Sequence, residues 1–218
     1  NSFMRTKPVF PLLVSMSVPM MLSMLIQSLY NIVDSIYVSR LGTDALTAVS
    51  LAYPLQNAIV SVGVGIGVGI SSAISIHLGS GDQEKADRAA SLGVVLTFFH
   101  CILFILAGIF ITRPFLSLFT SDPAILKDAC DYTYIVLCLS FGALLQLAFE
   151  KIFQGIGKMK ITMYLLIVGC VINIILDPVL IFGLLGFPAM GVAGAAIATV
   201  LGQISAFLLY IVVYVRKK

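Results

Sequence analysis

Long apolar runs divide the whole sequence, and this division constrains the fold more than any other feature. A helix needs about 20 residues to cross the hydrocarbon core of a bilayer. Six runs are long enough: residues 11–37, 45–76, 91–112, 124–152, 161–183 and 191–214. They do not alternate over about ten residues, as the strands of a membrane barrel do. Only 11% of all residues are charged, against about 25% in soluble domains. The sequence therefore predicts an all-α integral membrane protein.

The basic residues predict how the chain is oriented. Of the 13 Lys and Arg residues, Arg40, Arg113 and Lys127 fall in one set of loops, and the remaining ten fall near the two termini and in the alternate loops. The positive-inside rule then places both termini in the cytoplasm, with an even number of spans. Charges scattered through short loops do not form a nucleic-acid surface. We expect a multi-pass protein of the plasma (inner) membrane whose surroundings are lipid, with no nucleic-acid partner.

The fifth apolar run contains two polar residues, Asn173 and Asp177. They are four residues apart, so they share one helix face. Pro178 follows the carboxylate directly and leaves the Ile174 carbonyl without its usual helical partner. A carboxylate in mid-membrane costs roughly 2.5 to 3.5 kcal/mol on insertion scales, which makes Asp177 a functional candidate.

Two other runs bring polar groups to a similar depth. The second half of the first run carries Gln27, Tyr30 and Asp34 at spacings that share one helix face. Such a face must point to the bundle interior or to water. The sixth run carries Thr199 at the end of a stretch of small residues. At 1.5 Å per residue, Asp34, Asp177 and Thr199 all fall in the outer half of the bilayer, so the sequence allows one cluster.

The chemistry of this cluster indicates cation handling. Asp34, Asp177, Asn173 and Thr199 together offer two carboxylates, an amide oxygen and a hydroxyl, which are hard ligands suited to Na⁺. Alternatively, one carboxyl group beside another and away from water can carry a proton. Both alternatives describe ion coupling in a transporter. We expect Na⁺ or H⁺ as the coupling ion and no further cofactor, and no His or Cys accompanies these oxygens to favour metal catalysis.

Smaller motifs predict local structure. The overlapping pairs Gly63/Gly67 and Gly65/Gly69 favour close helix packing and lack the spacing of a nucleotide-binding loop. Thr43 or Asp44, Asp82, and Asp122 before Pro123 are candidate helix caps. Glu150 and Lys151 are expected to form a solvated pair near the inner surface. His100 is expected to be a hydrogen-bonded packing residue.

Several segments, in order along essentially the whole chain, resemble the multidrug and toxic compound extrusion (MATE) transporters. They are Tyr30–Tyr37, Leu41–Leu46, Leu78–Asp82, Asn173–Pro178 and Gly191–Thr199. The resemblance implies one six-helix lobe of a twelve-helix transporter, the amino-terminal lobe, with the carboxy-terminal lobe absent from this chain. One departure is Ser39, which stands where many relatives have Gly before the basic residue.

The resemblance also implies a function and assigns residues to it. The implied function is cation-driven export of organic, often cationic, compounds by alternating access, and not an enzymatic reaction. Asp34, Asn173, Asp177 and Thr199 match the cation-binding positions of the lobe. Gln27, Tyr30 and Ala195 are weaker matches.

Three other functions are less well supported by the sequence. A lipid-linked oligosaccharide flippase of related fold would favour a strongly basic cavity, whereas the spans hold almost no internal Lys or Arg. An intramembrane aspartyl protease would use Asp34 and Asp177 as two carboxyl groups that share a proton. However, Ile-Ile-Leu precedes Asp177, where those proteases resemble one another in Gly-x-Gly-Asp. A membrane scaffold without ion chemistry leaves two costly carboxylates unexplained.

Overall fold

The computed structural model describes residues 8–216, and every secondary-structure element in that range is helical. The elements are α2 (Val9–Ser39), α3 (Thr43–Gly79), α4 (Gln83–Leu116), α5 (Pro123–Cys138), α6 (Phe141–Gly155), α7 (Met159–Phe182), the 3₁₀ turn η1 (Leu184–Gly186) and α8 (Gly191–Arg216). Five of these helices are long and apolar enough to cross a membrane, and the bent pair α5 and α6 counts as a sixth span if it crosses as one unit. The all-α membrane fold is confirmed. The basic residues Arg5, Lys7, Lys217 and Lys218, which entered the orientation argument, lie outside the described residues.

The predicted run 124–152 is not one continuous helix. It forms α5 and α6, which are bent by 45° at Leu139 and Ser140. The Ser140 N–H donates to the Leu137 carbonyl, so the helical ladder tightens where α5 ends. Next to the break, a Cβ on Gly142 would lie 2.8 Å from Ile204 Cγ1 of α8. The apolar composition predicted residence in the membrane, but packing against α8 sets the direction of this segment.

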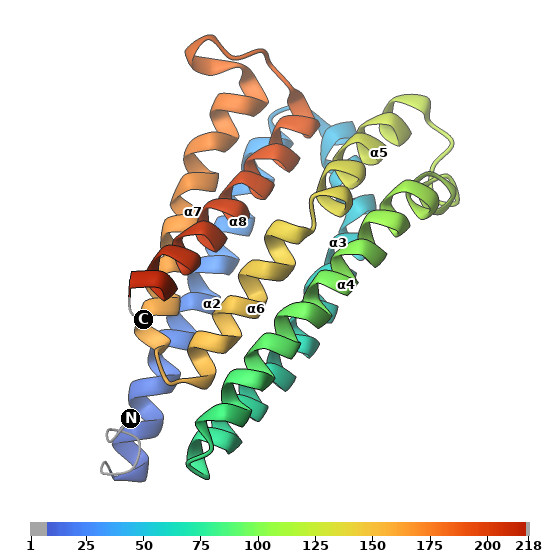
Figure 1. Cartoon of the computed structure of the whole chain (residues 1–218). Helices are drawn as coiled ribbons and strands as arrows, with labels where there is room; N and C mark the ends of the chain where they lie inside the picture. The colour runs from blue at the N-terminus through green and yellow to red at the C-terminus, as the bar shows by residue number, and fades with distance from the viewer. Residues whose placement is uncertain (1–7, 217–218) are drawn as a thin grey trace.

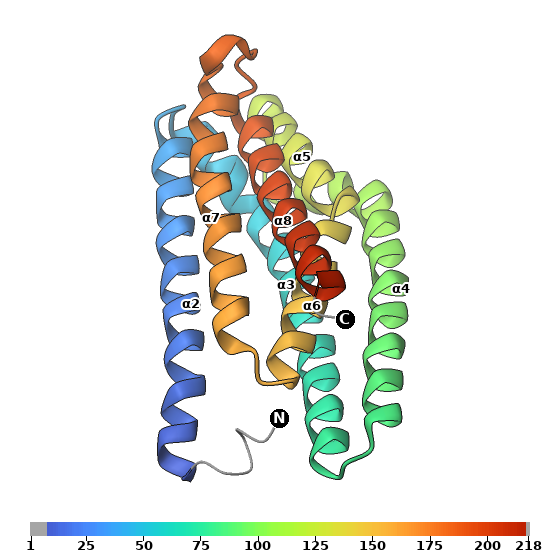
Figure 2. The same ribbon diagram turned by 60° about the vertical axis from the view of Figure 1, so that its left-hand side comes forward.

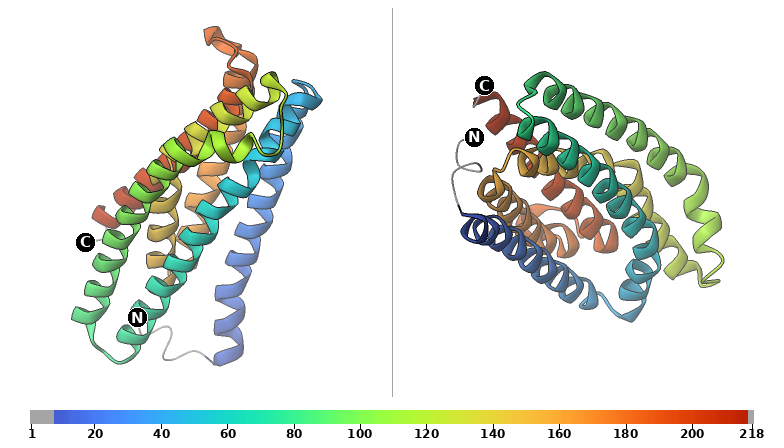
Figure 3. Two further views of the ribbon diagram at one scale, coloured as in Figure 1. Left: turned by 90° about the vertical axis from the view of Figure 1, so that its right-hand side faces the viewer. Right: turned by 90° about the horizontal axis from the view of Figure 1, so that it is seen from below.

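The helices form one bundle in which α7 packs between α2 and α8, and α3 packs between α4 and α6. Seen along the bundle, α2 and α4 lie on opposite flanks (Figure 3). Figure 2 shows α8 crossing in front of α3 and α6. The start of α2 and the end of α8 lie toward the same end of the bundle as the α3–α4 and α6–α7 turns (Figure 1). Only Pro19 and Val38 of α2 are buried, so this helix is the most loosely enclosed of the bundle.

Helix starts show which of the predicted caps form. Asp122 caps α5 by accepting from the Ala124 and Ile125 N–H groups at 2.8 and 3.2 Å. Asp82 accepts from the Lys85 N–H at 3.0 Å, and α4, which it caps, is a long spanning helix. The cap expected from Thr43 or Asp44 was wrong. Gly42, at φ 123°, holds that position, and no side chain bonds to the first turn of α3.

Close backbone contacts at glycine bring helices together. A Cβ on Gly194 would lie 2.6 Å from the Leu180 carbonyl oxygen, so α8 passes directly over the backbone of α7. Further along α8, a Cβ on Gly202 would lie 3.0 Å from the Gly169 carbonyl oxygen. On α3, a Cβ on Gly63 would lie 2.7 Å from Leu147 Cδ1 of α6, as predicted for close packing. The second α3 pair, Gly65 and Gly69, has nothing within 4 Å.

Candidate cation site

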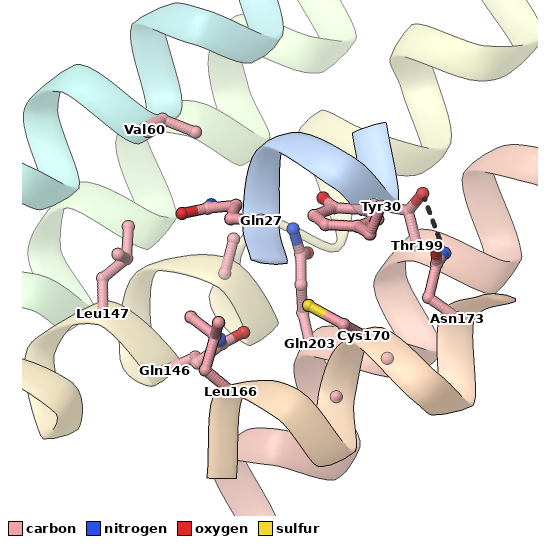
Figure 4. A pocket seen from close by; sticks show the side chains of 13 residues that line it. Gln27, Tyr30, Val60, Gln146, Leu147, Leu166, Cys170, Asn173, Thr199 and Gln203 are labelled. Carbon is pink, nitrogen blue, oxygen red and sulfur yellow. Dashed lines mark hydrogen bonds between the residues drawn. The ribbon is translucent and has the colours of Figure 1, made fainter. Parts of the chain in front are cut away.

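The close crossing of α7 and α8 brings three predicted site residues together. Asn173 and Asp177 lie one turn apart on α7, and Thr199 faces them from α8. The Asn173 Nδ2 donates to Thr199 Oγ1 at 3.4 Å (Figure 4). It also donates to Asp177 Oδ1 at 3.4 Å. These bonds are longer than the usual 2.9–3.0 Å. The three residues are 2%, 0% and 4% exposed, so the cluster is closed off from solvent.

The fourth predicted residue, Asp34, comes from α2. This helix packs mainly against α7. Asp34 is half-buried, and its carboxyl group lies within electrostatic range of Asp177. Two acidic side chains from neighbouring helices therefore lie in the same region, an arrangement that the depth estimate from the sequence allowed. In a bilayer, that region has little water to separate their charges.

Three oxygens of this cluster are buried without a hydrogen-bond partner among the described residues. They are Asp34 Oδ1, Asn173 Oδ1 and Asp177 Oδ2. A buried oxygen without a partner costs on the order of 1–3 kcal/mol, so each of these oxygens favours the approach of a positively charged ligand. Hard oxygen ligands of this kind suit Na⁺, and the carboxyl oxygens suit a proton. Within residues 8–216, no group of three or more His, Cys, Asp and Glu side chains could hold a metal ion, so the set differs from a transition-metal centre.

A tyrosine and a glutamine that the sequence did not single out join the site from α5 and α3. The Tyr132 hydroxyl donates to Gln56 Oε1 at 3.2 Å. Tyr132 is buried and lies within electrostatic range of Tyr30, Asp34 and Asp177. A tyrosine near the start of an apolar run looks like any interfacial aromatic residue, so no sequence signal identifies Tyr132. Gln56 is an amide inside the second apolar run, and this polar position could have identified it from the sequence.

A cavity of about 70 Å³ adjoins Asn173 and Thr199 on the side toward the α6–α7 turn. Besides Asn173, three glutamine side chains line it, Gln27 of α2, Gln146 of α6 and Gln203 of α8 (Figure 4). Tyr30 and Cys170 complete the polar part of the lining. The volume and the polar lining suit a few ordered water molecules. Gln203 lies one turn after Thr199 on the same helix face, and this spacing could have identified it from the sequence.

The weaker candidates separate into two kinds. Gln27 and Tyr30 both line the cavity, and Tyr30 lies within electrostatic range of Asp34 and Asp177. Ala195 is fully buried in the core cluster with Ile181 and Val192, and it does not line the cavity. The structure therefore places Ala195 in packing between helices.

Comparison with known proteins identifies the family of the chain. The family model described as MatE matches residues 19–179. The chain is 35% identical over 202 residues to the probable multidrug resistance protein YoeA of Bacillus subtilis, covering 92% of this chain and 43% of the relative. It is 28% identical over 210 residues to the multidrug export protein MepA of Staphylococcus saprophyticus, covering 96% of this chain and 46% of the relative.

Solved structures give the same result. The MATE multidrug transporter DinF-BH superposes with a TM-score of 0.90 at 31% identity, over 98% of this chain and 47% of that protein. The chain thus spans less than half the length of these relatives, in keeping with one lobe of a two-lobe transporter. The family model covers well over half of the chain, and the chain therefore belongs to the MatE family of membrane transporters.

Proposed function

We propose that this chain is the ion-coupling lobe of an antiporter that exports organic compounds in exchange for Na⁺ or H⁺. The main observation that supports this proposal is that Asp34, Asn173 and Asp177 each have a buried oxygen without a hydrogen-bond partner among the described residues. Thr199 adds a hydroxyl at the same place. The names of the relatives, which describe multidrug resistance and export proteins, support the transport class.

The proposed mechanism couples the cation to the position of α2. A single Na⁺ or H⁺ held between Asp34 and Asp177 neutralises one of their two negative charges, weakens the repulsion between the carboxyl groups and links α2 to α7. Without it, the two carboxylates repel one another across a medium of low dielectric constant. Because α2 is loosely enclosed and contains Pro19, this helix can change its bend at small cost. Alternating access then follows from two arrangements of α2 that the cation and the exported compound favour differently.

The substrate and the cellular setting are also part of this proposal. We assign an organic, cationic substrate because the acidic side chains of the site lie next to an amide-lined cavity. The chain works together with a second, carboxy-terminal lobe of the size that the relatives possess beyond the matched region. We place it in the plasma membrane with both termini in the cytoplasm, on the basis of the basic residues in alternate loops.

Dye export from cells that lack their own pumps tests this function. The wild type, Asp34→Asn and Asp177→Asn are expressed within the two-lobe parent protein, and export of a fluorescent organic cation is followed while Na⁺ and pH are varied separately. Asp44→Asn is the matched control, because Asp44 is an exposed carboxylate in the first turn of α3, outside the site. We expect export by the wild type and the control, and none by the two site variants.

Either of two results would overturn the proposal. Normal export by Asp177→Asn would remove the coupling role of this carboxylate. An expressed wild type that exports no organic cation would contradict the substrate class, and a lipid-linked oligosaccharide flippase assay on the same proteins would then be the next test. The response of the wild type to Na⁺ or to pH identifies the coupling ion.

A further inference from the structure

A second group of polar and charged side chains lies on α6, outside the candidate cation site. Gln146, Glu150 and Gln154 are spaced four residues apart and therefore share one face of the helix. Gln146 lines the cavity described above. Glu150 follows it by about 6 Å of helix toward the α6–α7 turn. The polar face of α6 thus continues from the cavity toward the end of the bundle that is rich in basic residues.

The side chains of this group form a closed network that satisfies only one oxygen of the carboxylate. Glu150 Oε1 accepts from Gln154 Nε2 at 2.8 Å and from Lys151 Nζ at 3.3 Å. Lys151 Nζ also donates to Gln154 Oε1 at 2.9 Å. Both bonds to Glu150 use Oε1, so Oε2 has no donor within the described part of the chain. The pair is not the solvated pair expected from the sequence, because the Lys151 and Glu150 side chains are only 14% and 12% exposed.

Lys151 reaches Glu150 only because the neighbouring helix leaves space for its stem. Adjacent residues of a helix do not face one another, so the Lys151 side chain must bend back to meet Glu150. Its stem runs over Gly67 of α3, where a Cβ would lie 2.5 Å from Lys151 Cγ. Gly67, identified in the sequence as part of a small-residue pair, therefore serves this contact. The ammonium group is closer to the Gln154 amide than to the carboxylate, so another cation can displace it from Glu150.

Two aromatic residues of the same stretch of α6, Phe149 and Phe153, pack against aromatic side chains of α8. Phe149 packs against Phe207 and Tyr214 of α8, with ring centroids 5.5 and 6.4 Å apart. Phe153 packs against Tyr210 at 5.5 Å. Tyr210 lies within electrostatic range of Glu150. The neighbouring positions of this turn are therefore aromatic and poor in water, and a carboxylate in such surroundings suits an organic cation better than a small hydrated ion.

We propose that Glu150 is a recognition site for organic cations, and that Lys151 is a built-in cation that occupies the site until a substrate displaces it. This site is separate from the one at Asp34 and Asp177, which holds the coupling ion. The proposal rests on the proposed export of organic cations and assigns to this lobe a residue that selects them. When a substrate displaces Lys151, the ammonium group keeps its bond to Gln154 and loses its bond to Glu150, and the Glu150 carboxylate then contacts the substrate.

Two probe ions of one shape and opposite charge test this assignment by direct binding. Tetraphenylphosphonium and tetraphenylborate are titrated against the purified two-lobe protein in detergent. In Lys151→Met the stem over Gly67 is kept and the competing charge is removed, so we expect the Kd for the phosphonium ion to fall about fivefold, which corresponds to about 1 kcal/mol. In Glu150→Gln we expect that Kd to rise by at least as much, and the preference for the cation over the borate to disappear.

Matched controls separate this local effect from the general charge of the inner surface. Glu84→Gln and Lys160→Met make the same charge changes at exposed positions on the same side of the bundle, and we expect them to leave both Kd values unchanged. Gly67→Ala is a second way to separate Lys151 from Glu150, because the new methyl group pushes the Lys151 stem away without removing the charge of its ammonium group. We expect it to lower the phosphonium Kd as Lys151→Met does, so the test remains decisive if Lys151→Met does not fold.

The proposal fails if Glu150→Gln binds the phosphonium ion as tightly as Glu84→Gln does. It also fails if Gly67→Ala and Lys151→Met leave that Kd unchanged. These binding results do not depend on ion coupling, which is tested separately at Asp34 and Asp177. If the tests at Asp34 and Asp177 fail but Glu150→Gln still weakens phosphonium binding, only the antiporter mechanism is refuted. If those tests succeed but Glu150→Gln does not change phosphonium binding, only the role of Glu150 is refuted.

Discussion

Replacing Gly194 with Ala perturbs the contact that forms the candidate site. A Cβ at this position would lie 2.6 Å from the oxygen and 2.7 Å from the carbon of the Leu180 carbonyl. The same carbonyl accepts the Met190 N–H at 2.9 Å, which closes the connection between α7 and α8. The neighbouring atoms are backbone, so a side-chain rotation cannot relieve the contact. The two helices must move apart.

The magnitude follows from these distances. Carbon and oxygen atoms without a bond between them normally approach to about 3.3 Å, so α7 and α8 must separate by about 0.7 Å at Gly194. Overpacking of this kind costs about 2–3 kcal/mol, and Ala gains back about 1 kcal/mol over Gly inside a helix. We therefore expect Gly194→Ala to destabilise the protein by about 1–2 kcal/mol. The Asn173–Thr199 hydrogen bond, already 3.4 Å long, is expected to break.

The thermal unfolding midpoint of the purified protein measures this cost, and Gly65→Ala is the matched control. Gly65 lies inside α3 with nothing within 4 Å, so its replacement adds helix propensity without a clash. A cost of about 1–2 kcal/mol lowers the midpoint by about 2–8 °C in a chain of this size. A Gly194→Ala variant that unfolds at or above the midpoint of Gly65→Ala would refute the close backbone contact.

Three further predictions concern single side chains. Thr199→Val keeps the shape of the side chain but removes the hydroxyl that Asn173 contacts. We expect the cation affinity measured in a titration to fall about fivefold, or about 1 kcal/mol. An unchanged affinity would exclude Thr199 as a ligand. Asp122→Ala removes both cap bonds of α5, and we expect a loss of about 1 kcal/mol in the free energy of unfolding, whereas Thr43→Ala, which removes no cap, should cost little. The side chain of Lys85 and its backbone N–H hold the pKa of Asp82 below its ordinary value. This contribution to stability is therefore present above the ordinary pKa of Asp and is lost as the pH falls through the lowered pKa; a pH series of unfolding midpoints should show that acid-side loss in the wild type and less of it in Asp82→Asn.

The sequence predicted the membrane class, and it singled out candidate site residues, because both depend on strong local signals. A charged residue inside an apolar run is costly in lipid, so Asp34 and Asp177 stood out without knowledge of their neighbours. The four-residue spacing of Asn173 and Asp177 fixed their common face before any contact was known. The spacing and depth arguments also placed Thr199 near them, and the structure shows the hydrogen bond.

Other features depend on tertiary contacts that leave no local signal. The bend between α5 and α6 occurs next to the close contact of Gly142 with α8, and a single Gly inside an apolar run does not specify which helix will pack against it. Tyr132 comes near the site only because α5 packs against α3 and α8, which an aromatic residue in an apolar run does not reveal. The capping residue of α3 was misplaced because Gly42 adopts φ 123°, a conformation that sequence patterns around Thr43 do not specify.

The most direct test of the central claim is the unfolding midpoint of the purified chain, measured against Na⁺ at fixed pH and against pH at fixed Na⁺. A cation that binds only the folded state stabilises it by about 2.7 kcal/mol at 100 times its Kd. We predict that the wild-type midpoint rises with Na⁺ or with falling pH, and that Asp34→Asn and Asp177→Asn each lose this response. A wild type that responds to neither ion, or an Asp177→Asn variant that responds as the wild type does, would contradict the assignment of the cation to these residues.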